Sequence, residues 1–229
     1  MNETFIEIYK EIEAFANKKF NQTGKYMPMS QLTDELIEHV AGAKDFATDF
    51  ELFNNLRNMM QHKASDKYFL IQPEVVDLIR HVYEVITQPL TVGSLFRSEV
   101  IFVPSDAAFS DLMTLVRTHH HTQFPVVKNG RVLTTQLITA NAIVHSLSEN
   151  PKAAPTVEQI LENSQAVIRF IKPDDSIFTA ENRLLDEMKT GQKSVVLLIT
   201  EVENLQTLKP SDVLGVINIT DLPKILSQK

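Results

Sequence analysis

The sequence predicts an α+β protein, in which a four-helix bundle precedes two β-α-β-β-α units paired about a pseudo-twofold axis. Apolar residues recur at helical spacing up to residue 86, and from Val92 onward they gather in short β-branched runs. Those runs repeat with a period of roughly 65–70 residues. We therefore expect a helical domain at residues 1–88 and repeated units at residues 89–150 and 151–229.

Four amphipathic stripes predict the helices of the first domain. Their apolar positions are Phe5, Ile8, Ile12 and Phe15; Leu32, Leu36 and Val40; Phe46, Phe50, Phe53 and Met60; and Val75, Ile79, Val82 and Ile86. We expect Ser30 to cap the second helix and Pro73 to lie in the first turn of the fourth. Because each helix must bury its apolar stripe, the four are expected to pack as a bundle.

Strand-like runs dominate the remainder of the chain. They read "EVIFV", "FPVV", "RVLTTQLI", "AVIRFI", "SVVLLI" and "VLGVIN", separated by short helical patterns. The "TQPLT" stretch at residues 87–91 is the expected boundary between the two parts. Duplicated units of this kind bury their sheets against each other, and the cleft between them is the expected ligand site.

Composition excludes several classes of function. The net charge of −7 creates no overall field that attracts polyanions, and the absence of cysteine rules out disulfides and thiolate metal sites. No apolar run approaches the ~18 residues of a membrane span, so we expect a cytoplasmic protein without membrane contact. The sequence also lacks a P-loop, G-x-G-x-x-G, G-x-S-x-G and H-E-x-x-H. "HHH" at residues 119–121 cannot direct three neighbouring imidazoles at one ion, so we expect no metal site.

The segment "LGVINITDLPKI" is the most specific motif. A glycine that ends a strand, Gly215, is followed by two apolar residues, Asn218, two variable residues and Asp221. With the recurring Val-Pro or Ile-x-Pro step, it makes residues 89–226 resemble a tandem pair of cystathionine-β-synthase (CBS) domains, a Bateman module. Such pairs generally bind adenine nucleotides.

The resemblance implies particular roles for several residues. Asp221 would accept hydrogen bonds from ribose hydroxyls, and Asn218 stands where the family has a phosphate-contacting Ser or Thr. A helix N-terminus at this position would favour phosphate. The other expected ligand-binding residues are Thr220, Thr139, Asn141, Val103, Pro104 and His120. The alternative role of Asp221 is that of a helix N-cap.

The first repeat departs from the motif. In "TTQLITANAI", Thr139 holds the hydroxyl position, but Gln136 replaces the glycine and Ala142 replaces the aspartate. The ribose-binding carboxylate is therefore missing. This repeat has either a degenerate site or a site that uses Thr139 and Asn141 differently, or it serves only as a scaffold for the other repeat.

A second motif lies in the helical part. "RNMMQH" contains Arg57, Asn58 and His62, and on the third of four predicted helices it resembles the motif of HEPN-domain ribonucleases. His62 would transfer a proton and Arg57 would stabilise the charge of the transition state. However, an i,i+5 pair lies about 140° apart on a helix. Residues 1–88 also carry 9 Lys and Arg against 14 Asp and Glu. A structural role for the motif competes with catalysis.

The sequence thus predicts a regulatory homodimer. It would bind an adenine nucleotide (AMP, ADP, ATP or cyclic di-AMP) as its regulatory ligand, require no other cofactor, and change its helical domain or an unidentified protein partner. The alternative is a nucleotide-regulated, metal-independent ribonuclease that cleaves RNA with Arg57 and His62.

Overall fold

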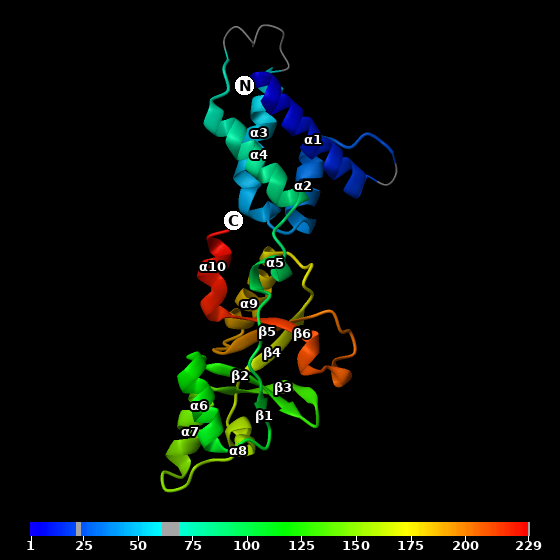
Figure 1. Cartoon of the computed structure of the whole chain (residues 1–229). Helices are drawn as coiled ribbons and strands as arrows, with labels where there is room; N and C mark the ends of the chain where they lie inside the picture. Colours follow the sequence, from blue (N-terminus) through cyan, green and yellow to red (C-terminus); the bar gives the residue numbers. More distant parts are fainter. Residues whose placement is uncertain (22–23, 61–68, 229) are drawn as a thin grey trace. The chain divides into compact units, whose positions relative to one another are not determined.

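The chain forms two compact units, residues 1–90 and 91–228. The computed structural model describes residues 1–21, 24–60 and 69–228 (Figure 1). In the described residues of the first unit the regular elements are all helices, and the second unit contains helices with two three-stranded sheets. The predicted α+β class is therefore confirmed.

The first unit contains α1 (Asn2–Phe20), α2 (Met29–His39), α3 (Ala47–Met60), α4 (Pro73–Thr87) and the 3-10 helix η1 (Ala43–Phe46). Pro73 is in the first turn of α4, as predicted. Ser30, in contrast, does not cap α2, because the helix already begins at Met29 after the extended residue Pro28.

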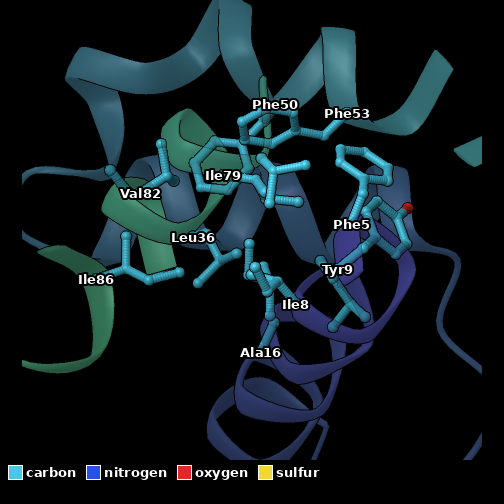
Figure 2. Close-up of a cluster of buried hydrophobic side chains, with 14 of the residues drawn as sticks. Phe5, Ile8, Tyr9, Ala16, Leu36, Phe50, Phe53, Ile79, Val82 and Ile86 are labelled. Carbon is cyan, nitrogen blue, oxygen red and sulfur yellow. The ribbon is translucent and has the colours of Figure 1, made fainter. Parts of the chain in front are cut away.

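Aromatic rings form the centre of this unit. The rings of Phe5 and Phe53 meet edge to face with centroids 6.0 Å apart, and Phe50 contacts Phe53 in the same geometry at 6.4 Å. Figure 2 shows these rings pointing toward Ile79 of α4. Fully buried aromatic side chains supply much of the apolar burial that stabilises a small helical unit.

Each sheet of the second unit has the same topology. The strands are β1 (Val103–Pro104), β2 (Gln123–Lys128), β3 (Arg131–Thr139), β4 (Val167–Ile171), β5 (Val195–Thr200) and β6 (Val213–Asn218). The first strand of each sheet pairs parallel with the second, and the second pairs antiparallel with the third. This identity of pairing agrees with the sequence repeat. The run "EVIFV" pairs only at its last residue, Val103, whereas Val100 and Phe102 lie outside β1 and pack against the apolar cluster that joins the two sheets.

The helices of the second unit are α5 (Val92–Phe96), α6 (Phe109–His119), α7 (Ala140–Glu149), α8 (Val157–Glu162), α9 (Ile177–Lys189) and α10 (Leu222–Leu226). Figure 1 shows the two sheets between α5, α9 and α10 on one side and α6, α7 and α8 on the other. An apolar cluster joins the sheets, with Leu137 of β3 and Leu198 of β5 among its fully buried members.

The first helix of each repeat packs on the sheet of the other repeat. α5 precedes the first sheet in sequence but lies on β6, where Ser98 N–H donates to the Leu214 carbonyl at 3.0 Å. α8 precedes the second sheet, yet its Ile160 belongs to the apolar core of the first. Gly215 allows the approach of α5, since a Cβ at this position would overlap the carbonyl group of Phe96.

Candidate ligand-binding site

A cleft of about 320 Å³ brings together His120, Asn218, Thr220 and Asp221, four of the predicted site residues. We call it the Asp221 cleft. It is also lined by residues 98–101, which follow α5, and by His121, Thr122 and Gln123 at the start of β2. Both repeats therefore contribute to it, as expected for a cleft between paired units.

Hydrogen bonds within the turn after β6 hold Asp221 in place. The backbone N–H of Asn218 donates to Oδ2 of Asp221 at 2.9 Å. Asn218 Oδ1 in turn accepts from both the N–H and the hydroxyl of Thr220, at 2.7 and 2.6 Å. Asp221 thus does take part in capping the 3-10 helix η5 (Ile219–Asp221). Its second carboxylate oxygen makes no hydrogen bond within the described residues, so its lone pairs can accept hydrogen bonds from a ligand.

Histidines at the end of α6 form another part of the border of the cleft. α6 ends at His119, and His120 adopts the left-handed conformation with φ 54°. The rings of His119 and His121 then stack with centroids 5.9 Å apart. His120 and His121 line the cleft, whereas no group of three metal-ligating side chains occurs in the described parts of the chain.

Gln123 is a lining residue that sequence reasoning missed. Its Nε2 donates to the hydroxyl of Ser194 at 2.8 Å, while its buried Oε1 has no hydrogen-bond partner in the part of the chain that the structure describes. Ser194 precedes β5 of the other repeat and lines the second cleft described below. Gln123 therefore connects the two clefts through one hydrogen bond. A glutamine at the start of a strand carries no sequence signal that predicts this position.

The first repeat has an equivalent cleft of about 410 Å³, which we call the Thr139 cleft. It is lined by Thr139 and Asn141, both predicted as ligand-binding residues, and by Ala142 at the position equivalent to Asp221. Thr139 caps α7 by accepting a hydrogen bond from the Ala142 N–H at 3.0 Å. Gln136, at the position of Gly215, donates to the Leu161 carbonyl of α8 at 3.4 Å. The repeat therefore keeps the turn but lacks the carboxylate.

Two predicted ligand-binding residues lie elsewhere. Val103 is fully buried and pairs with Val126, and Pro104 lines a separate cavity of about 560 Å³ beside Lys128 and Glu158. Neither residue lines the Asp221 cleft or the Thr139 cleft. They mark the end of β1, whereas both clefts gather residues from the start of the central strand of a sheet.

In the helical unit, Arg57 and Asn58 line a cavity of about 230 Å³ together with Tyr9. The Arg57 guanidinium carbon lies 5.9 Å from the centroid of the Tyr9 ring. The Tyr9 hydroxyl donates to Asn54 Oδ1 at 2.7 Å, and burial raises the pKa of Tyr9 to about 12 although the Arg57 charge opposes this. His62 lies outside the described residues, so its proposed pairing with Arg57 stays a prediction.

Comparison with known proteins agrees with the second unit. Residues 92–148 match the family model of the CBS domain. No curated protein matches the chain. In the described residues, no helix has both the length and the apolar character needed to cross a membrane.

Several solved structures resemble part of the chain. The CBS domain pair of protein MJ0100 in complex with 5′-methylthioadenosine and S-adenosyl-L-methionine is 15% identical, covers 61% of this chain and 97% of its own, and has a TM-score of 0.45. The CBS domain of a bacterial CNNM/CorC family Mg²⁺ transporter in complex with ATP is 16% identical, covers 69% and 99%, and has a TM-score of 0.45. AcuB, an acetoin utilization protein from Vibrio cholerae, is 12% identical, covers 61% and 91%, and has a TM-score of 0.44.

Proposed function

We propose that the chain is a regulatory protein that binds an adenine nucleotide in the Asp221 cleft and thereby changes its helical unit or a partner. The observation that carries the proposal is the position of Asp221 in a cleft formed by both repeats, with one carboxylate oxygen fixed by the backbone and the other without a hydrogen bond in the described chain. A carboxylate held in this way can accept from two adjacent ribose hydroxyls. The CBS match over residues 92–148 supports the same function.

The position of α5 supports the regulatory part of the proposal. α5 is the first element after the helical unit along the chain, and Ser98, just beyond it, both lines the Asp221 cleft and donates to Leu214 of β6. Lys224 of α10 also donates to the Leu95 carbonyl at 2.8 Å. A ligand bound at the turn of Asp221 therefore contacts the segment around α5 and Ser98. This segment directly follows the helical unit along the chain, so a change in its position can reach that unit.

The test compares two aspartates with the same structural role. Asp212 accepts from the Lys209 N–H at 2.9 Å, as Asp221 does from Asn218, but Asp212 lies outside the Asp221 cleft. Asp221→Ala should weaken binding of adenine compounds about 10–100-fold, which corresponds to ~1.5–3 kcal/mol of lost hydrogen bonds to a charged group. Asp212→Ala should leave affinity unchanged.

Affinity is measured by calorimetry on the full chain, after a thermal-shift screen against adenine and guanine compounds. A ligand at 100 times its dissociation constant adds about 2.7 kcal/mol to the apparent stability of the folded state. Unaltered affinity in Asp221→Ala, or an equal loss in Asp212→Ala, would contradict the proposed site.

A further inference from the structure

Resting on the proposed function, we propose that the Asp221 cleft selects adenosine derivatives with little or no negative charge at the 5′ position, and that it discriminates against polyphosphates such as ATP. Three observations on the cleft support this ligand class: the charges of its lining, the use of its hydrogen-bond donors, and the length of the helix after it.

In the part of the chain that the structure describes, the lining of the cleft contains two carboxylates, and neither a lysine nor an arginine. Among the described residues that line it, the ionisable side chains are those of Glu99, Asp221, His120 and His121. No lysine or arginine of the described chain lines it, so the carboxylates of Glu99 and Asp221 dominate the local field. The Thr139 cleft differs in this respect, because Lys193 lines it beside Glu162. Each added phosphate charge therefore costs free energy in the Asp221 cleft.

Three hydrogen-bond donors of the turn at Asp221 are already used within the turn. The N–H and hydroxyl of Thr220 both donate to Asn218 Oδ1, and the Asn218 N–H donates to Asp221. Asn218 stands at the position of the family's phosphate-contacting hydroxyl. Its side-chain oxygen accepts two hydrogen bonds from Thr220 within the same turn. A phosphate that used any of these three donors would first have to break the hydrogen bond that the donor makes now.

The helix after the turn is too short to compensate. α10 contains only the five residues Leu222–Leu226. The electrostatic effect of a helix N-terminus grows from aligned peptide dipoles, and a helix of little more than one turn aligns few of them. In this proposal the helix N-terminus expected at this position therefore adds little attraction for phosphate. The Asp221 carboxylate, in contrast, needs only ribose hydroxyls as donors.

The experiment measures the dissociation constants of adenosine, AMP and ATP for the full chain at pH 8 without divalent cations, counting only binding that Asp221→Ala weakens about tenfold or more. Adenosine should bind at least tenfold more tightly than ATP, with AMP between them. Raising NaCl from about 0.1 M to about 1 M shortens the Debye length from about 10 Å to about 3 Å. Salt should therefore improve ATP binding relative to adenosine, which is opposite to its effect at a basic phosphate site.

A matched pair of variants tests the cause. Glu99→Gln removes an exposed carboxylate from the cleft, and Glu201→Gln removes an exposed carboxylate elsewhere in the same unit. Only Glu99→Gln should lower the ratio of the ATP dissociation constant to the adenosine dissociation constant, by several-fold. ATP binding as tight as adenosine, weaker relative ATP binding at high salt, or equal ratios in both variants would overturn this inference alone. If none of the three compounds binds, both this inference and the proposed function fail.

Discussion

Replacing Gly215 with alanine should destabilise the second unit, because α5 lies directly over this residue. A Cβ at Gly215 would lie 3.2 Å from the carbonyl carbon of Phe96 and 3.0 Å from Cδ1 of Ile199, and closer still to the Phe96 carbonyl oxygen. Ile199 can adjust its side chain, whereas the Phe96 carbonyl is backbone. The methyl group must therefore displace α5.

The expected loss of stability follows from the bonds that anchor α5. Restoring an ordinary van der Waals contact requires a movement of about 1 Å. The hydrogen bond from Ser98 to Leu214, 3.0 Å long, would then exceed hydrogen-bonding distance. Losing one such bond costs about 1 kcal/mol, and overpacking adds about 1–3 kcal/mol. The total of about 2–4 kcal/mol opposes the usual effect of Gly→Ala, which stabilises by about 0.4–1 kcal/mol where the backbone permits it.

Urea denaturation followed by two probes measures this change. All four tyrosines, Tyr9, Tyr26, Tyr68 and Tyr83, lie in the first 90 residues, so tyrosine fluorescence reports on the helical unit and far-UV circular dichroism reports on both units. Gln136→Ala, at the equivalent position of the first repeat, is the control and should lose no more than about 1 kcal/mol. A Gly215→Ala protein as stable as the original would refute the argument that α5 requires a glycine.

Three further predictions concern the helical unit and assembly. Burial raises the pKa of Tyr9 from 10.0 to about 12, so the unfolded chain loses the phenol proton first and stability falls as the pH rises above 10. Between pH 9 and pH 11 the free energy of unfolding should drop by about 1.4 kcal/mol more in the original protein than in Tyr9→Phe. Equal pH dependence of the two proteins in urea titrations would contradict a buried phenol. Single-stranded RNA should remain intact with or without adenine nucleotides, since Arg57 lies over the Tyr9 ring and the helical part is acidic; metal-free cleavage that both Arg57→Ala and His62→Ala abolish would show the opposite. Light scattering should give roughly twice 26.0 kDa if the chain associates as the resemblance to CBS pairs implies, and a concentration-independent monomer would exclude the dimer.

Periodicity predicted most elements because burial imposes it locally. The four helical stripes and five of the six strand runs lie where the sequence placed them, since each buries an apolar face. The short helix α5 gave no comparable signal. Its place is determined by Gly215, which is distant in sequence, and by the Thr91 side chain that caps it.

The part of the candidate site that lies within one sequence motif could be predicted. Asn218, Thr220 and Asp221 are adjacent in the chain, so a local pattern predicts their shared turn. Glu99 and Gln123 reach the same cleft from other elements, and single-sequence patterns contain no information on such tertiary proximity. The Tyr9–Asn54 hydrogen bond was missed for the same reason, because its partners are 45 residues apart.

Because α5 packs on the second sheet and α8 on the first, the residues of one sequence repeat do not make up one complete packed unit. A fragment cut at residues 89–150 would keep α5, which has no sheet of its own to cover there, and would lack α8, leaving the side chains around Val103 and Phe124 open to water. Neither repeat can then be removed without uncovering the other. The first repeat therefore has a structural role in covering the second, although it carries Ala142 where the second carries Asp221.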